Sequence, residues 1–180
     1  GSMTVTVRAE NSNYTDPEDV TYTLKVNPAP VTVTALPAGK VYGAADPVFI
    51  AKVDGMVKGE SLSLINYSIS RSPGEAAMLY SKGIIPAGDP LQGDYAVTYV
   101  PADFTIDRAG GLTLKADNYE GIYDGKLHGN AATVSVTEGT TVKYRVGAGG
   151  IWSSDVPQIK DLGSMTVTVR AENSNYTDPE

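Results

Sequence analysis

The feature that most constrains this chain is a long, identical duplication. The stretch GSMTVTVRAENSNYTDPE forms residues 1–18 and recurs, letter for letter, as residues 163–180. Gly163 is the copy of Gly1, so the chain is one full period (residues 1–162) followed by the beginning of the next. Sequences that recur at a fixed period form arrays of stacked modules. The duplication therefore predicts a tandem repeat protein.

A weaker repeat divides each period into two halves. Residues 31–44 (VTVTALPAGKVYGA) align without a gap with residues 112–125 (LTLKADNYEGIYDG), which begin exactly half a period later. The alignment matches the apolar positions and sets Tyr42 against Tyr123. In the same register, Asn13-Tyr14 falls opposite Asp94-Tyr95. Each period therefore resembles two diverged copies of one module of about 80 residues, a length that can bury its own core.

Composition and alternation indicate an all-β chain. Val, Tyr and Thr are plentiful beside 19 Gly and 11 Pro, as is typical of short strands joined by turns. Residues 3–9 and 20–26 alternate with period two and predict a hairpin around a loop rich in Asn, Asp and Pro. Only residues 54–63 are compatible with a helical turn. The other predicted strands are 31–35, 48–53, 66–71, 77–85, 95–107 (with a bulge or edge position at Pro101), 112–116, 122–124, 132–137, 142–146 and 165–171.

The predicted fold is two Ig-like β-sandwich modules in tandem, forming an elongated molecule. The first complete module covers residues 29–108, and the second covers residues 109–180 and lacks its last strand. Residues 1–28 are the C-terminal strand hairpin of a preceding, incomplete module. The joints NPAP (27–30) and RAGG (108–111) are too short for the modules to fold back on each other.

The duplication also predicts strand exchange. The first copy of the repeated stretch is followed by Val20–Val26, whereas the chain stops at Glu180 before a second copy of that strand. We expect the last module to expose an open strand edge as a result. Residues 19–27 of another molecule could then add to this edge, so residues 1–28 are a candidate for self-association.

Two short motifs carry a family resemblance. VYGAADPVF (41–49) with FTI (104–106) resembles the MBG domain of YGX type, a repeat of bacterial surface proteins. IYDGKLHG (122–129) followed by VTVRAENSNYTDPE (167–180) is similar to the YDG-type Ig-like repeats that accompany it. Together the two resemblances cover roughly residues 31–180. They imply modules that space or present an adhesive head on a bacterial cell surface, in a cell-wall-anchored or secreted protein.

No catalytic, cofactor-binding or metal-ligating residue emerges from the sequence, so an enzyme is not expected. His128 is the one histidine and has no second ligand or base beside it. The glycines of GAGG (147–150) lack the Lys-Ser/Thr of a phosphate loop and are interpreted as a hairpin turn. Ser153 has no paired base. A formal charge of −7 argues against nucleic acid as a partner.

Two binding alternatives stay open at this point. Six side chains of the first loop could offer oxygen ligands to calcium, namely Glu10, Asp16, Glu18 and Asp19 together with Asn11 and Asn13. EF-hand spacing is absent, however, and turn geometry alone requires such residues. Tyrosines together with Trp152 could form a face that binds a carbohydrate or mucin. The competing interpretation is that Tyr14 and Tyr95 close module ends, with each hydroxyl on a turn carbonyl as in tyrosine corners.

The preferred function is therefore structural, namely a stalk or spacer repeat of a bacterial cell-surface adhesin. The alternative is a carbohydrate- or mucin-binding module of a surface protein. The expected partners are neighbouring repeats of the same protein, a second copy of the chain, and a host glycan or glycoprotein. No cofactor is expected.

Overall fold

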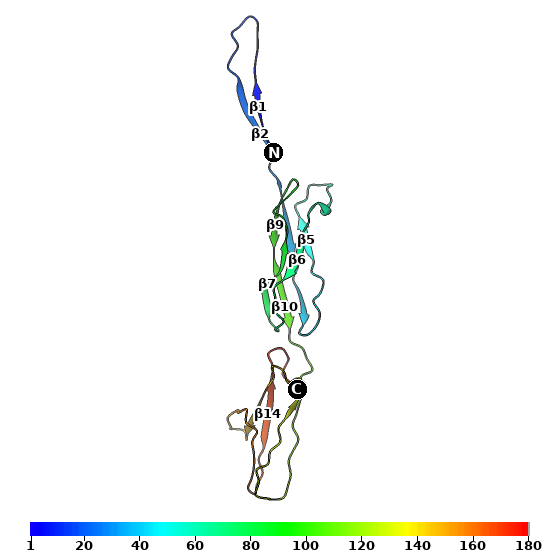
Figure 1. The fold of residues 1–180 in the computed structure, drawn as a ribbon, viewed down its shortest axis with the longest axis vertical. Coiled ribbons are helices and arrows are strands. Elements are labelled where there is room, and N and C mark those ends of the chain that lie inside the picture. The colour runs from blue at the N-terminus through cyan, green and yellow to red at the C-terminus, as the bar shows by residue number, and fades with distance from the viewer. Residues whose placement is uncertain (180) are drawn as a thin grey trace. The chain divides into compact units, whose positions relative to one another are not determined.

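The protein is all-β. A computed structural model describes residues 1–179, and the only helical element in that range is one 3-10 turn, η1 (Leu62–Leu64). This turn overlaps the end of the stretch 54–63, where the sequence allows a helical turn. Within these residues, no helix has the length and apolar character needed to cross a membrane. The predicted all-β class is thus confirmed, and several separate sheets are consistent with β-sandwich architecture (Figure 1). The tandem arrangement of two modules stays a prediction.

The chain divides into two compact units. The first contains residues 1–36, 49–70 and 84–102, and the second contains residues 37–48, 71–83 and the chain from Asp103 onward.

Two segments of the chain contribute one strand to each four-stranded sheet, and a proline lies between the two strands of each segment. β3 (Ala29–Ala35) and β4 (Ala38–Val41) are separated by Leu36 and Pro37, and β9 (Tyr95–Val100) and β10 (Ala102–Asp107) are separated by Pro101. Proline donates no backbone hydrogen bond, so it ends the pairing in one sheet. The single strand predicted over 95–107 is therefore two strands.

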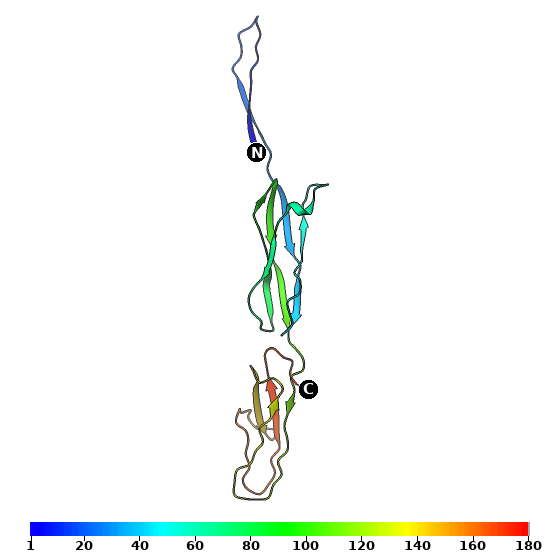
Figure 2. The same ribbon diagram turned by 45° about the vertical axis from the view of Figure 1, so that its right-hand side comes forward.

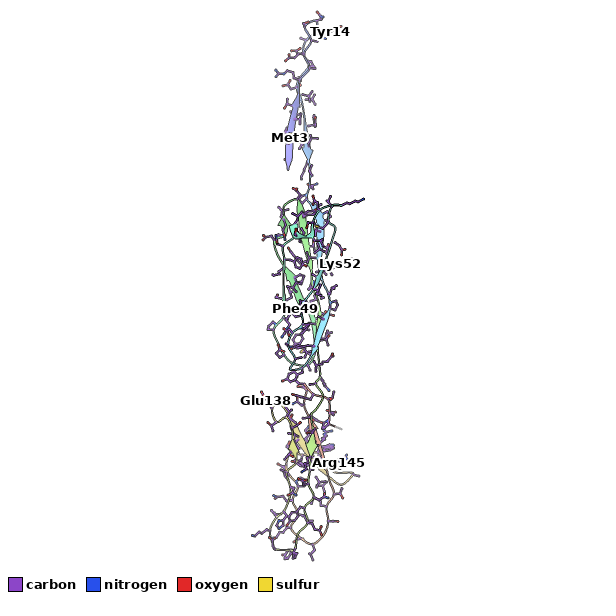
Figure 3. The ribbon with its side chains drawn as sticks, turned by 90° about the vertical axis from the view of Figure 1, so that its right-hand side faces the viewer. Met3, Tyr14, Phe49, Lys52, Glu138 and Arg145 are labelled. Carbon is purple, nitrogen blue, oxygen red and sulfur yellow. The ribbon has the colours of Figure 1, made fainter. Side chains whose placement is uncertain are left out.

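A solvent-exposed hairpin begins the first unit. β1 (Ser2–Val7) pairs antiparallel with β2 (Val20–Lys25), with Ser2 opposite Lys25 and Val7 opposite Val20. This confirms the hairpin predicted from the alternation. All of its side chains are exposed except that of Val5, and Tyr14 lies at the tip of its loop (Figure 3). A two-stranded hairpin with no covered face is marginally stable in water.

The first unit also contains a sheet of order β5-β3-β9-β8, with β5 at Ala51–Asp54 and β8 at Leu91–Gln92. β3 runs parallel to β9 and antiparallel to β5. Alternate side chains of β3 are buried, as its sequence predicts, and they join the cluster Val31, Val33, Ile65, Tyr95 and Val97. Each buried apolar side chain of this size contributes about 1.5–3 kcal/mol.

The second four-stranded sheet has the order β4-β10-β7-β6, with β6 at Ser68–Arg71 and β7 at Leu79–Ala87. β4 runs parallel to β10, and Phe104 and Ile106 of β10 are buried. β4 was not predicted, because AGKV has no apolar alternation. Gly39 is required there, since a Cβ atom would lie 2.8 Å from the Thr105 carbonyl oxygen of the paired strand.

Two short antiparallel pairs complete the second unit. They are β11 (Leu114–Lys115) with β12 (Thr133–Val134), and β13 (Thr141–Val146) with β14 (Val167–Glu172). Figure 2 shows β13 and β14 side by side. β11 and β12 are shorter than the strands predicted over 112–116 and 132–137. The strand predicted over 122–124 is wrong, because the chain turns there: Gly125 has a positive φ of 74° and Asp124 accepts a hydrogen bond from the Lys126 N–H.

The two halves of the period share one backbone arrangement. The Ala29 N–H donates to the Asp94 carbonyl (2.8 Å), and Ala29 lies opposite Tyr95 in a parallel pair. The Ala109 N–H donates to the Asn175 carbonyl (2.9 Å), and Ala109 lies opposite Tyr176, also in parallel. Tyr176 stands half a period after Tyr95 in the sequence. Ala109, however, stands one residue short of half a period after Ala29, so the two pairings resemble each other but differ in register by one residue, and the internal repeat stays a prediction.

Candidate functional site

The duplicated loop adopts the same local turn in both copies. In the first copy, Asn11 Oδ1 accepts from the Asn13 N–H (2.9 Å) and the Asn11 carbonyl accepts from the Tyr14 N–H (3.1 Å). In the second copy, Asn173 Oδ1 accepts from the Asn175 N–H (3.0 Å) and the Asn173 carbonyl accepts from the Tyr176 N–H (3.2 Å). An asparagine that bonds the backbone two residues on creates this kind of turn. The turn is therefore a local property of the repeated stretch.

The surroundings of the two copies differ. Asn173 is only 7% exposed, and its Nδ2 donates to the Glu138 carbonyl (3.0 Å) and to Thr140 Oγ1 (2.8 Å). Its counterpart Asn11 is exposed. A buried amide must have its hydrogen-bonding groups satisfied, and both the Nδ2 and the Oδ1 of Asn173 have partners. Asn173 therefore fixes the second loop to the turn before β13.

The second loop contacts three distant parts of the same compact unit. Asn175 Oδ1 accepts a hydrogen bond from the Ala77 N–H (2.9 Å). The Tyr176 ring meets the Tyr42 ring edge to face, with centroids 5.6 Å apart. The Ala109 carbonyl accepts from the Thr177 N–H (2.9 Å) beside them. We call the set Tyr42, Ala77, Ala109, Asn175 and Tyr176 the tyrosine joint.

The backbone positions Tyr42 for this contact. Tyr42 directly follows β4, and its N–H donates to the Asp107 carbonyl (2.8 Å) at the end of β10. Gly43 then adopts a positive φ of 81°, a conformation that glycine reaches without steric cost. The Ala44 N–H closes the turn on the Val41 carbonyl (3.0 Å). The Tyr-Gly pair thus ends the strand and places the Tyr42 ring at the joint.

Four charged side chains hold the turn that carries Ala77. Lys40 Nζ lies 2.8 Å from Asp46 and 2.5 Å from Glu75, and the Lys40 side chain is only 6% exposed. Arg71 Nε lies 2.6 Å from Asp46, and another of its nitrogens donates to Glu75. Arg71 also donates to the carbonyls of Ser72 and Gly74 (2.9 and 2.7 Å), and its guanidinium covers the Phe104 ring. We call Lys40, Asp46, Arg71 and Glu75 the ion cluster.

The ion cluster shifts the titration of its own members. Hydrogen bonds from Arg71 and then Lys40 lower the pKa of the Asp46 carboxyl. The Lys40 ammonium, followed by Arg71, lowers the pKa of Glu75. The same contacts raise the pKa values of Lys40 and Arg71. The cluster is therefore fully charged at neutral pH and favours one conformation of residues 71–77.

A cavity of about 580 Å³ lies elsewhere in the second unit. The inner face of β14 contributes Val167 and Val169, and Met165 precedes them. Tyr119, Tyr123, His128, Ile159 and Leu162 are among the other lining residues. Trp152 does not line it.

Comparison with known families identifies one part of the chain. Residues 31–105 match the MBG domain (YGX type). This family consists of non-catalytic repeat modules that are typical of bacterial surface proteins. Neither the curated proteins nor the solved structures contain a match.

The match over residues 31–105 confirms the MBG part of the predicted resemblance. It includes the Tyr-Gly turn at Tyr42 and the first two residues of the FTI sequence within β10, Phe104 and Thr105. It also supplies Tyr42 and Ala77 to the tyrosine joint and all four residues of the ion cluster. The YDG-type assignment of the chain beyond the MBG domain stays a prediction.

The residues considered for catalysis are occupied by local contacts. His128 Nε2 lies 2.7 Å from Asp124 Oδ1, and its ring stacks on Tyr119 at 4.7 Å. The hydrogen bond with His128 lowers the pKa of Asp124. Ser153 Oγ lies 3.2 Å from Asp155 Oδ2. These contacts order turns in the chain that follows residue 105.

The GAGG stretch is a turn, as predicted. Gly147 has a positive φ of 63°, and the chain then folds back on β13. The Tyr144 N–H donates to the Ser153 carbonyl (2.7 Å), and the Ser153 N–H donates to the Tyr144 carbonyl (2.9 Å).

The acidic side chains of the first loop have partners within the hairpin. Asp19 makes two hydrogen bonds with Arg8 (2.9 and 3.0 Å), and Asp16 Oδ1 accepts from the Asn11 N–H (3.3 Å). Within residues 1–179, no group of three or more His, Cys, Asp or Glu side chains could hold a metal ion. Asp16 and Asp19, two of the side chains proposed as calcium ligands, are therefore used in the hairpin itself.

The aromatic predictions have mixed outcomes. Tyr95 is buried, but its hydroxyl accepts from the Val57 N–H (3.1 Å) and bonds Glu60, whereas a carbonyl partner was expected. The prediction for Tyr14 is wrong, because this side chain is 78% exposed. Its copy Tyr176 packs against another part of the fold instead, through the Tyr42 ring.

Trp152 lies against two guanidinium groups, those of Arg145 (4.8 Å from the ring centroid) and Arg170 (4.3 Å). Such cation–π contacts are favourable. They place Trp152 beside the charged face of β13 and β14, whereas Tyr119 and Tyr123 line the cavity. Trp152 and these two tyrosines thus have different surroundings, and a face that combines tyrosines with Trp152 stays a prediction.

Sequence reasoning missed the ion cluster and the partners of Tyr176. The four residues come from two stretches that lie far apart in the sequence, Lys40 and Asp46 from one and Arg71 and Glu75 from the other. The one available signal for the joint was Tyr42 itself, the tyrosine of the Tyr-Gly motif.

Proposed function

We propose that this chain is a spacer repeat of a bacterial cell-surface adhesin, in which MBG domains alternate with a second Ig-like module. The tyrosine joint is the observation that carries the proposal. It connects the MBG domain, through Tyr42 and Ala77, to the repeated loop through Asn175 and Tyr176. Neighbouring repeats of the same protein are then the principal partners of the chain.

The chemistry of the joint suits a spacer. Its contacts are a hydrogen bond to a backbone N–H, backbone bonds at Ala109 and one ring pair, all between uncharged groups. Uncharged contacts depend little on ionic strength, whereas exposed ion pairs are screened by salt. A joint of this kind keeps its geometry in the varied solutions outside a cell.

Surface display of an epitope on repeats of the period 1–162 tests the spacer function. Chains of one, two and three periods carry the same terminal epitope, and its height above the cell is measured by fluorescence interference. We expect the height to increase with each added period. A height that does not depend on the number of periods would contradict the proposal.

A glycan array probed with the full chain tests the alternative function. A spacer retains no glycan above the level seen with an unrelated β-sandwich protein of similar charge. Specific retention of a host glycan or mucin fragment would instead favour a binding module, with the cavity beside β14 as the first place to map.

A further inference from the structure

Three stretches of the chain carry Asn-x-Ser/Thr, the sequence that N-glycosylating enzymes recognise. They are residues 13–15 (NYT), 66–68 (NYS) and 175–177 (NYT). Such a short motif often arises by chance, so its structural surroundings decide whether an enzyme can use it. An acceptor asparagine must be exposed, and its side-chain amide must not already be bound within the fold.

The side chain of Asn66 meets both requirements. Asn66 is exposed, and its side-chain amide makes no hydrogen bond within residues 1–179. The backbone of Asn66 is bound by the Gln92 side chain instead. Gln92 Oε1 accepts from the Asn66 N–H (2.7 Å), and Gln92 Nε2 donates to the Asn66 carbonyl (2.9 Å). The backbone is therefore held in place without any contribution from the Asn66 amide.

Gln92 is itself fixed by neighbouring groups. Its Nε2 lies 3.0 Å from the Asp89 carbonyl oxygen and 2.8 Å from the Tyr99 hydroxyl oxygen. The Tyr99 hydroxyl in turn donates to the Asp89 carbonyl (3.0 Å). These contacts position Gln92 against Asn66, so the acceptor residue has an ordered backbone and an unbound side chain.

Ser68, the hydroxyl residue of the motif, begins β6 at the edge of its sheet. Within residues 1–179, β6 pairs with β7 alone, so its other backbone edge is open. Ser68 is exposed, and its Oγ donates to the Ala87 carbonyl over 3.4 Å, a long and therefore weak hydrogen bond. Proteins that bind an extended segment pair with an open edge of this kind. The stretch 66–68 thus offers both its side chains and an adjoining backbone edge.

The motif at 175–177 has different surroundings. Asn175 Oδ1 accepts a hydrogen bond from the Ala77 N–H (2.9 Å). The Tyr176 ring packs on Tyr42, and the Thr177 N–H donates to the Ala109 carbonyl (2.9 Å). All three residues of this motif are therefore used by the fold, which makes it a matched negative control within the same chain.

We propose that Asn66 is an acceptor for N-glycosylation in the folded protein. Asn66 Nδ2 forms a bond to the anomeric carbon of a sugar that is activated by a nucleoside diphosphate. The bond between that carbon and the diphosphate oxygen breaks, the diphosphate leaves with the bonding electrons, and the amide nitrogen loses one proton. The transfer requires no oxidant or reductant. The inference does not depend on the spacer function.

A sugar at Asn66 would stand beside the open edge of β6. Exposed strand edges are sites of unwanted pairing with other chains, and proteins block them with charges, proline or a covering segment. A bulky, hydrated sugar would have the same effect at this edge.

Transfer of glucose from UDP-glucose by a soluble N-glucosyltransferase specific for Asn-x-Ser/Thr tests the proposal on the folded full chain. Every chain carries Asn13→Gln, so that residues 66–68 and 175–177 are the remaining motifs. Peptide mass spectrometry measures the rate of hexose addition at each asparagine, relative to an unfolded peptide of the same sequence. We expect addition at Asn66. Addition at Asn175 should be at least about five-fold slower, the equilibrium effect of one hydrogen bond.

Variants separate recognition of the motif from effects on the fold. Asn66→Gln and Ser68→Ala should abolish addition at position 66, whereas Ser68→Thr should retain it. Asn66→Gln should leave the melting temperature unchanged, because the Asn66 amide binds nothing within the fold. Tyr42→Ala loosens the tyrosine joint, so it should raise the rate at Asn175 and leave the rate at Asn66 unaltered.

Three results would overturn the proposal. The first is a folded chain that receives no hexose at Asn66. The second is an equal relative rate at Asn66 and Asn175, which would show that the surroundings of the motif do not matter. The third is unchanged addition at Asn66 in the Ser68→Ala chain.

Discussion

Tyr42 and Tyr176 meet edge to face, with ring centroids 5.6 Å apart and ring planes at 70°. This arrangement brings the positive edge of one ring to the negative face of the other, and contributes about 0.5–1.5 kcal/mol beyond the area that it buries. Tyr14 occupies the same position in the first copy of the repeated stretch, yet it is 78% exposed. The duplication thus offers a control residue for every substitution in the second loop.

Removing the ring of Tyr176 should destabilise the joint. We expect Tyr176→Ala to lower the free energy of unfolding of the second unit by about 1–2 kcal/mol, through the loss of the ring pair and of buried area. Tyr14→Ala, the matched control, should change it by less than about 0.5 kcal/mol. Urea denaturation measures both. Equal effects would show that the contact with Tyr42 contributes nothing.

A double-mutant cycle isolates the ring pair itself. Tyr42→Ala and Tyr176→Ala should show a coupling energy of about 0.5–1.5 kcal/mol, because the second substitution removes a contact already lost in the first. Strictly additive effects would contradict the pairing.

The buried amide of Asn173 should contribute more than its exposed counterpart. Asn173→Ala leaves the Glu138 carbonyl and Thr140 Oγ1 without this donor, which costs about 1–3 kcal/mol. Asn11→Ala removes only the local turn bond at Asn13 and should cost less than about 0.5 kcal/mol. Thermal unfolding of the two variants measures the difference. A larger effect at Asn11 than at Asn173 would contradict the proposed role of the second loop.

The ion cluster predicts a loss of stability in acid. The ordinary pKa values of Asp46 and Glu75, 3.8 and 4.5, are lowered in the folded protein. A lowered carboxyl pKa stabilises the fold above the ordinary value, and this stabilisation is lost as the pH falls through the folded-state value. The melting temperature should therefore decline below about pH 4.

The control for this acid effect is Asp46→Asn, which cannot titrate at that position. Its melting temperature should be lower than that of the wild type at neutral pH and should decline less steeply in acid. An identical acid profile in the two chains would show that the cluster does not carry the effect.

Removal of metal ions should leave the melting temperature of the protein unchanged. Asp16 and Asp19 already bind Asn11 and Arg8, so the first loop does not depend on an ion for its charge balance. We expect the melting temperature to be the same in a chelator and in millimolar calcium. A rise of several degrees with calcium would show preferential binding to the folded state and would restore Glu10, Asp16 and Asp19 as ligands.

Strands with strict alternation were predictable, and short strands were not. VTVTA within β3 and the hairpin β1–β2 carry the period-two pattern that a strand with one covered face requires. β8 is only Leu91–Gln92 and β4 begins Ala-Gly, so neither contains a pattern to detect. Ile122-Tyr123 looked like a strand because both residues favour strands, but the Asp-Gly turn that follows determines the conformation there.

The tyrosine joint shows why local sequence alone cannot predict the surroundings of a side chain. Tyr14 and Tyr176 lie in identical copies of one stretch, and their loops share one turn, but Tyr14 is exposed while Tyr176 packs on the Tyr42 ring. A prediction based on local sequence must assign both residues the same surroundings. The difference arises from Tyr42 and Ala77, which lie far from Tyr176 in the sequence and are brought to the second loop by the fold.

The positions of the joint residues within the period also affect how the number of repeats in such a gene can change. Asn173, Asn175 and Tyr176 belong to the stretch that recurs identically, and Tyr42 and Ala77 lie within the period 1–162. Recombination between two copies of the repeated stretch, in register, would add or remove whole periods and leave the residues at each remaining boundary the same. The number of repeats could then vary between generations without any new interface having to evolve.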